Sequence, residues 1–265
     1  MKASIIRNNQ KAIYLTFATV FWAAVWYIVA LVLGNELFLP YPHTVLKALG
    51  ALLCEKNYWI SILNTVLTVI TGCLLGCLAG AVLSVLSSLS KLVETVISPL
   101  IAVFRATPVA SFIILVYVIV RLNQLPVRTV SLLIVMIMVI PIMYNNLRTG
   151  ISVMDRELAE VSTVYRFTFG KKLFVLWLPQ IKPYLLSSLT NALGFAWKAG
   201  VAAEVICNLK DTVGKHLADS KSNLEMDKLF AWTFTVILFS MLFELVFKKA
   251  FKKGAKQQPK EEVVS

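Results

Sequence analysis

Charged residues are scarce over most of this 265-residue sequence and are missing altogether from several long runs. They make up 15% of the residues, whereas 58% are hydrophobic, and the mean hydropathy is +0.76. A soluble domain does not need uninterrupted apolar runs that are long enough to cross a bilayer. The composition therefore excludes an ordinary soluble fold and predicts an all-α, polytopic membrane protein.

The sequence also lacks the signatures of several enzyme classes. Its Gly-Lys pairs, at Gly170 and Gly214, have neither the earlier glycine nor the following Ser or Thr of a nucleotide-binding phosphate loop. No H-E-x-x-H or G-x-S-x-G motif is present, and His43 and His216 belong to no evident metal-ligand cluster. We therefore expect no catalytic residue, no ATP site in this chain, no metal and no cofactor.

Acidic residues are outnumbered by basic ones, and the formal net charge is +12. A nucleic-acid partner would explain this charge, but Lys and Arg bracket the apolar runs, as they do in the cytoplasmic loops of membrane proteins. We therefore expect contact with a lipid bilayer and no nucleic acid. The four cysteines show neither a zinc-like spacing nor a disulfide framework.

Six stretches have the length and composition of transmembrane helices, for which about 20 apolar residues suffice. Pro40 and Pro42 end the first helix and predict an extended connection. Residues 148–182 form a charged loop, 208–228 a polar loop and 248–265 a solvated basic tail. The predicted spans, in a single transmembrane domain over 1–265, are about 12–33, 62–86, 97–120, 129–147, 183–206 and 229–247.

A row of small residues runs along the second predicted span. Gly72, Gly76 and Gly80 recur at every fourth position, and Ser84 continues the row. In a helix this spacing makes a ridge without side chains, against which the backbone of a neighbouring helix can pack closely. The pattern favours packing inside the protein over a seam between two copies.

Three ionisable residues lie within the predicted spans, where a charge is costly without a partner or water. Arg105, just before Pro108, either lines a polar path or binds an anionic group, or it snorkels to the near interface, which its position slightly favours. Lys198 and Glu204 are six residues apart, so they lie on different faces of a helix that we expect to face the protein interior. All three are candidates for a translocation path.

Residues 155–183 form a charged interruption between two apolar runs. Its basic residues keep the stretch in water, yet its aromatic and leucine residues give it a large apolar face. It is either a docking surface for a soluble partner or a loop whose apolar residues lie on the membrane surface. Outside the spans, 16 Lys and Arg residues fall on the side of this stretch and 8 on the other, so this side and both termini are predicted to be cytosolic.

The segment from Glu160 to Pro179 resembles the E-A-A loop of the permeases of binding-protein-dependent ABC importers. In that loop a short cytosolic helix begins at Glu, and a Leu-Pro pair follows about nineteen residues later. Further segments are similar to the nitrate, taurine and alkanesulfonate branch of the family. They are Leu39-Pro40-Tyr41-Pro42, Ser98-Pro99-Leu100, Arg105-Ala-Thr-Pro108, and Ala196-Trp197 followed by Glu204.

The segment departs from the E-A-A motif at three positions. Val161 and Ser162 replace the two alanines, and Arg166 stands where the motif has a glycine that permits a left-handed turn. The nearest glycine is Gly170. The turn is therefore either made differently or shifted along the chain.

The resemblance implies a permease of a bacterial cell membrane, with a coupling helix between the fourth and fifth of six transmembrane helices. Its partners would be cytosolic ABC ATPase subunits, a second permease copy and an extracytoplasmic solute-binding protein. The branch implies transport of a small anion such as a sulfonate, taurine or nitrate, or of a vitamin precursor. The residues expected to couple to the ATPase are Glu157, Glu160, Tyr165, Arg166, Phe167, Phe169 and Gly170.

Three other functions stay open from the sequence. The transmembrane subunit of an energy-coupling-factor importer would also place coupling helices against ATPases. A membrane-embedded enzyme acting on lipid is disfavoured, because no nucleophile, metal site or acid/base pair clusters at an interface. A passive channel would need no ATPase.

Overall fold

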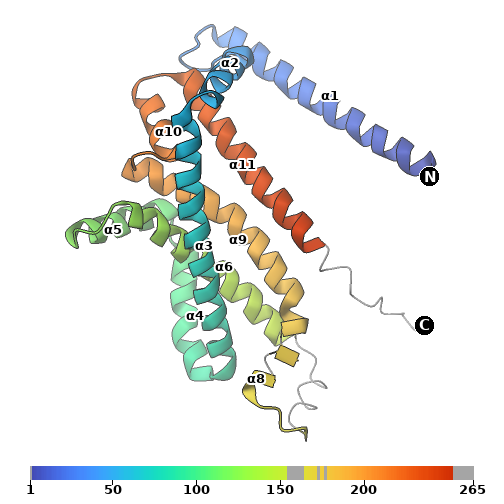
Figure 1. The fold of residues 1–265 in the computed structure, drawn as a ribbon, viewed down its shortest axis with the longest axis vertical. Helices are drawn as coiled ribbons and strands as arrows, with labels where there is room; N and C mark the ends of the chain where they lie inside the picture. The colour runs from blue at the N-terminus through green and yellow to red at the C-terminus, as the bar shows by residue number, and fades with distance from the viewer. Residues whose placement is uncertain (1, 154–163, 172–173, 176–177, 253–265) are drawn as a thin grey trace.

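The structure, a computed structural model, describes residues 2–153, 164–171, 174–175 and 178–252. These residues form helices and contain no strand, which confirms the predicted all-α class (Figure 1). In chain order the helices are α1 (Lys2–Leu33), α2 (Pro42–Leu53), α3 (Lys56–Leu89), α4 (Lys91–Ala106), α5 (Val109–Leu122), α6 (Arg128–Ser152), α8 (Phe169–Lys171), α9 (Leu178–Cys207), α10 (Val213–Ser222) and α11 (Met226–Lys252).

Among the helices of the described residues, four are long and apolar enough to cross a membrane: α1, α3, α6 and α11. The pair of α4 and α5 adds a fifth span if its two halves are counted together. Helix α9 has 30 residues, about 45 Å at the helical rise of 1.5 Å per residue, but it carries Lys182, Lys198 and Glu204. The predicted count of six spans stays a prediction.

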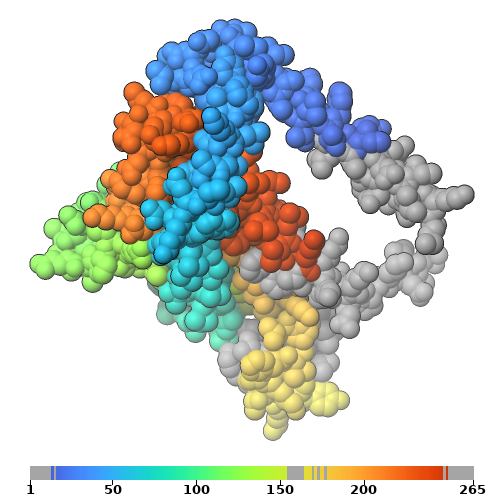
Figure 2. Space-filling view, turned by 45° about the horizontal axis from the view of Figure 1, so that its top comes forward, coloured from blue at the N-terminus to red at the C-terminus, as the bar shows by residue number. Residues whose placement is uncertain are grey.

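Helix α6 lies at the centre of the bundle, packed between α3 and α9. Its apolar window is 61% buried, compared with 6% for α1, which leaves the body beyond α2 (Figures 1 and 2). The main core joins Val69 of α3 to Val139 of α6 and Trp197 of α9. The buried Trp197 indole donates a hydrogen bond to the backbone oxygen of Val236 (2.9 Å), which also joins α9 to α11.

The row of glycines on α3 faces α6. A Cβ added at Gly72 or Gly76 would lie 2.8 Å from a carbonyl oxygen of α6, and at Gly80 the distance would be 2.7 Å. Such distances are too short for a real Cβ atom, so the backbones of α3 and α6 are closer than any residue other than glycine at these positions would allow. The facing oxygens belong to Leu132, Met136 and Ile140.

The third predicted span is not one straight helix. Helix α4 ends at Ala106, α5 begins at Val109, and the axes of the two helices differ by 107°. Pro108 disfavours helical backbone in the residue before it, and Thr107 is extended, with φ of −79° and ψ of 132°. The predicted helix over 97–120 is therefore corrected to a broken pair, and α5 projects sideways from the body (Figures 1 and 2).

Two connections at the α2 end of the bundle contain helices that the sequence analysis missed. Pro42 opens α2 instead of extended chain, because the fixed φ of proline suits the first turn of a helix. The predicted polar loop over 208–228 contains α10, which begins after the capping residue Thr212. His216 of α10 stacks on Trp232 of α11, with ring centroids 4.5 Å apart, and burial lowers the pKa of His216.

We predict that Gly76→Ala destabilises the chain by about 1–3 kcal/mol, because the added methyl group must push α3 away from the α6 backbone. The matched control is Gly194→Ala in α9, where an added Cβ would meet no atom within 4 Å. That variant should be neutral or slightly stabilising, by up to about 1 kcal/mol. Unfolding of both variants in detergent measures the difference, and equal stabilities would contradict the close approach of α3 and α6.

Candidate functional site

A pocket of about 520 Å³ lies where α4, α5, α6 and α9 meet, at the break in the third span. Its wall combines one cationic side chain, three amide side chains and two aromatic rings. Helix α4 supplies the residues just before the break, whereas α6 and α9 supply the amides. These residues are Phe104, Arg105, Asn145, Asn146, Asn191 and Phe195.

Arg105 is the charged residue of this pocket. It lies in the last turn of α4, eleven residues after Glu94, which corresponds to about 16 Å along the helix. No hydrogen bond or ion pair joins it to any residue that the structure describes. The structure thus places the exposed Arg105 in the wall of a pocket, and the choice between a polar path and snorkelling to the near interface stays a prediction.

The three asparagines of the pocket were missed by the sequence analysis. Asn145 and Asn146 donate their side-chain N–H groups to the carbonyl oxygens of Pro141 and Ile142, at 2.8 and 2.9 Å. These bonds hold both amides against α6. The signal that could have found them is an amide pair within an otherwise apolar run, since polar side chains at membrane depth are costly.

Lys198 is exposed and lies on the pocket side of α9. It follows Asn191 by seven residues and Phe195 by three, so the three side chains share one helix face. It is not part of the pocket wall, and it stands two turns beyond Asn191. The structure therefore brings Arg105, Asn191 and Phe195 together and leaves Lys198 further along the same face.

Glu204 lies on another side of α9 and is fully buried. Its Oε2 accepts hydrogen bonds from the Thr65 hydroxyl (2.9 Å) and the Gly214 backbone N–H (3.1 Å). The Thr65 hydroxyl oxygen also accepts from the Val213 N–H (3.1 Å), and a Cβ at Gly214 would collide with Glu204. Glu204 thus ties α9 to α3 and α10, away from the pocket.

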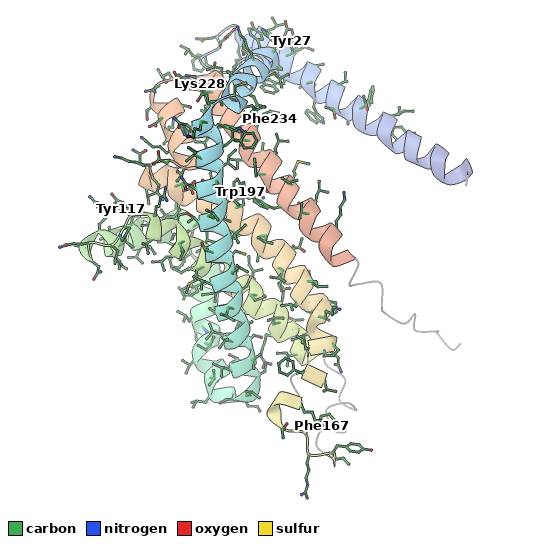
Figure 3. The ribbon with its side chains drawn as sticks, viewed as in Figure 1. Tyr27, Tyr117, Phe167, Trp197, Lys228 and Phe234 are labelled. Atoms are coloured by element: carbon green, nitrogen blue, oxygen red, sulfur yellow. The ribbon has the colours of Figure 1, made fainter. Side chains whose placement is uncertain are left out.

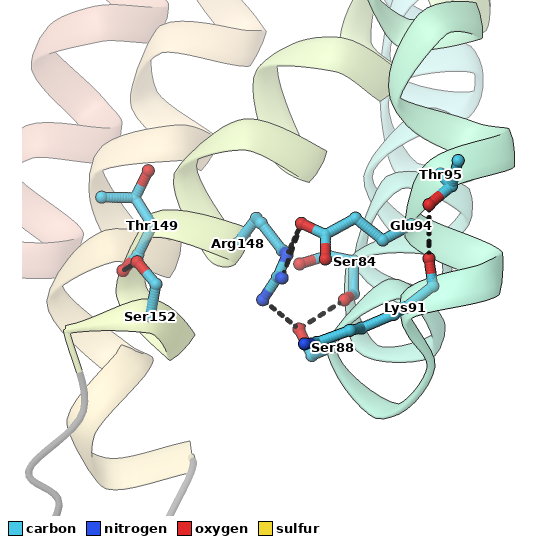
Figure 4. Close-up of polar contacts among 8 residues, drawn as sticks. All are labelled: Ser84, Ser88, Lys91, Glu94, Thr95, Arg148, Thr149 and Ser152. Atoms are coloured by element: carbon cyan, nitrogen blue, oxygen red, sulfur yellow. Dashed lines mark hydrogen bonds and ion pairs between the residues drawn. The ribbon is translucent and has the colours of Figure 1, made fainter.

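A second polar cluster joins α3, α4 and α6 at the other end of α4 (Figure 4). Arg148 of α6 forms an ion pair with Glu94 of α4, with Nη2 2.7 Å from Oε1, and donates to the Ser88 hydroxyl of α3 at 3.3 Å. The sequence analysis missed this pair, because the two partners are 54 residues apart in the chain. The cluster fastens the end of α6 that precedes residues 153–177, the segment between α6 and α9.

The predicted coupling residues are described only in part. Glu157 and Glu160 lie outside the described residues. Arg166 has a φ of 48°, in the left-handed region where glycine is favoured. Gly170 has no left-handed backbone, and a Cβ there would meet open space. Within the described residues the turn is therefore made at the position that the motif gives to glycine, and it has not shifted to Gly170.

Aromatic side chains flank this turn. The rings of Tyr165 and Phe167 are 6.4 Å apart, and the Lys171 ammonium group lies 5.2 Å from the centre of the Phe167 ring. Phe169 begins the short helix α8. Phe167 lies at the end of the molecule opposite to Tyr27 and Lys228 (Figure 3). The described part of the segment thus presents aromatic and basic groups at one end of the bundle.

Comparison with protein families gives a match over residues 72–252 to the binding-protein-dependent transport system inner membrane component. The matched range contains the broken span, the pocket, the Glu94–Arg148 pair and the charged stretch. A sequence comparison with curated proteins gives no match.

Three solved structures are similar in fold. A chain of an amino acid ABC transporter crystallised with histidines is 19% identical, with a TM-score of 0.60 over 75% of this chain and 92% of that one. A chain of the MetNI methionine ABC transporter in inward-facing conformations is 13% identical, with a TM-score of 0.65 over 73% and 94%. A chain of a bacterial alginate ABC transporter in complex with an alginate pentasaccharide-bound periplasmic protein is 13% identical, with a TM-score of 0.65 over 95% and 99%.

We predict that Glu94 and Arg148 are energetically coupled. A double-mutant cycle with Glu94→Gln and Arg148→Gln should give a coupling free energy of about 0.5–1 kcal/mol. The value is small because both side chains are partly exposed and screened by solvent. The matched control is the pair of Glu225 and Lys228, which lies within one helix turn and joins no two helices. Its cycle should give about 0.3 kcal/mol. Equal couplings would contradict a special role of the Glu94–Arg148 pair in fastening α4 to α6.

Proposed function

This chain belongs to the family of binding-protein-dependent transport system inner membrane components, the permeases of ABC importers, and we propose that two copies of it form the path for a small anionic solute. The observation that carries the proposal is the family match over residues 72–252, which is most of the chain. The likeness of the fold to chains of three ABC transporters supports the same class.

We place six spans in the bilayer: α1, α3, the broken pair of α4 and α5, α6, α9 and α11. The length of α9 supports its inclusion, because its roughly 45 Å exceed the bilayer core of about 30 Å. The excess of Lys and Arg places residues 148–182 and both chain ends in the cytosol of a bacterial cell.

The segment between α6 and α9 is the proposed docking surface for cytosolic ATPase subunits. Glu157 and Glu160 provide negative charge, and the residues around Arg166 provide the aromatic face. The left-handed backbone at Arg166 supports this assignment, because it occurs where the motif expects a glycine turn. Movement of the ATPases would reach α4 through α6, since Arg148 is bonded to Glu94 and Ser88.

Arg105 and Lys198 are the proposed path residues, and Glu204 holds α9 in place. The two cations favour an anionic solute such as a sulfonate, taurine or nitrate, or an anionic vitamin precursor. An extracytoplasmic binding protein would deliver the solute at the α2 and α10 end, opposite to Phe167. The path would lie between the two permease copies, with the pocket of each copy opening toward it.

We predict that Glu160→Lys abolishes uptake of the solute that the binding protein delivers, while the chain still inserts into the membrane. Charge reversal on the docking surface should uncouple ATP hydrolysis from transport. The matched control is Glu36→Lys, an exposed carboxylate before α2, which should leave uptake unchanged. Uptake by cells and ATPase activity of the purified complex are the measurements, and normal uptake by Glu160→Lys would refute the coupling role.

We predict opposite results for two substitutions at Arg166. Glycine accepts a φ of 48°, so Arg166→Gly should retain uptake and the ATPase partner. Proline fixes φ near −65°, so Arg166→Pro should lose both. Co-purification of the ATPase subunit with each tagged variant measures the effect. If the proline variant keeps its partner, the left-handed turn is not needed for docking.

A further inference from the structure

We propose that the pocket at the break between α4 and α5 is a solute-binding site within the membrane, which holds the anionic group of a small organic acid. This inference rests on the proposed transport function and goes beyond it. A translocation path need not contain a binding site of its own, in which case only the binding protein would select the solute. The pocket instead provides recognition inside each permease copy.

The first argument is the uncompensated charge of Arg105. Helices α4, α5, α6 and α9 together contain only two carboxylates, Glu94 and Glu204. Glu94 is paired with Arg148, and Glu204 is bonded to Thr65 and Gly214. Neither is available to Arg105, although a cation at membrane depth needs a counter-charge or water. An anion that enters the pocket supplies the counter-charge that these four helices do not.

The broken span adds to this preference. Val109 lines the pocket and is the first residue of α5, and no side chain caps the start of that helix. The first N–H groups of a helix have no partner within it and carry a partial positive charge. Half-helices that end at mid-depth in transporters direct such N–H groups at anionic solutes. The start of α5 and Arg105 therefore favour the same sign of charge.

The pocket extends along α6 from near the Glu94–Arg148 pair toward the middle of the helix. Its α6 wall runs from Met138 to Asn146, which lie ten and two residues before Arg148, or about 15 Å and about 3 Å along the helix. About 15 Å is half the thickness of the hydrocarbon layer. A solute held beside Met138 would therefore lie about midway across the layer, where the binding sites of transporters are found.

The size and lining of the pocket select an organic acid over a bare inorganic ion. Its volume of about 520 Å³ exceeds what an inorganic anion fills and suits a small organic molecule. Phe104 and Phe195 offer apolar surface. Asn145 and Asn146 each use an N–H on their own helix, so their Oδ1 atoms stay open as acceptors. The geometry therefore suits an anionic group, a short apolar part and a hydrogen-bond donor.

The experiment compares two thiol reagents of similar size on the full-length chain in nanodiscs. Cys54 and Cys207 are replaced by serine, and Asn191→Cys puts a thiol in the pocket wall. The reagents are the anionic sulfonatoethyl and the cationic trimethylammonioethyl methanethiosulfonates. The reference is the native exposed Cys54, kept in a second protein without the substitution at Asn191.

The quantity compared is the labelling rate with the anionic reagent divided by the labelling rate with the cationic reagent. We expect this ratio at the introduced cysteine to be about ten times the ratio at Cys54, because a nearby positive charge in a medium of intermediate dielectric constant attracts the anionic reagent. Arg105→Gln should lower the ratio to the Cys54 value. The matched control Arg121→Gln removes an exposed arginine at the far end of α5 and should leave the ratio unchanged. A ratio that is insensitive to Arg105→Gln overturns the proposal.

A competition test checks the class of solute. Isethionate, a small sulfonate with a hydroxyl group, should slow labelling, whereas nitrate at the same ionic strength should not. Equal protection by nitrate would overturn the assignment to organic acids. Labelling needs neither ATPase nor binding protein, so the two proposals can fail separately. Loss of uptake in Glu160→Lys without an anion preference in the pocket would leave the transport function standing and refute the site.

Discussion

The close approach of α3 and α6 is the constraint on which the rest of the structure depends. Three glycines place the two backbones in contact, and a lipid environment supplies little other drive for helices to associate. Helix α6 can then bury its opposite side against α9, where Trp197 extends the contact to α11. The central position of α6 also puts Asn145 at the break of the third span, and so the pocket depends on the same glycine row.

The broken span shows how one proline shapes both the third span and the pocket beside it. Pro108 makes a continuous helix unfavourable, and the 107° bend that results turns α5 away from the axis of α4. The bend leaves the exposed Arg105 at a helix end, in the wall of the pocket. A membrane protein can place a charge at depth when helices enclose it in a water-accessible pocket.

The sequence predicted features that have a local cause, and it missed features that need distant partners. The glycine row and the interruption at Pro108 are visible because spacing and residue type alone determine them. Short helices α2 and α10 were read as connections, although Pro42 and the cap at Thr212 are local signals; the packing of both helices against α11 is not visible in the sequence. The pocket amides, the Glu94–Arg148 pair and the bonds of Glu204 join residues far apart in the chain, and one sequence contains no record of such contacts.

The anchored end of α4 has a mechanical consequence. The ion pair with Arg148 holds α4 at Glu94, and the buried Ile101 packs against Ile140 and Tyr144 of α6. Arg105 follows Ile101 by four residues, about 6 Å along the helix. A movement of α6 is therefore passed to the guanidinium group through two contacts on α4, one polar and one apolar.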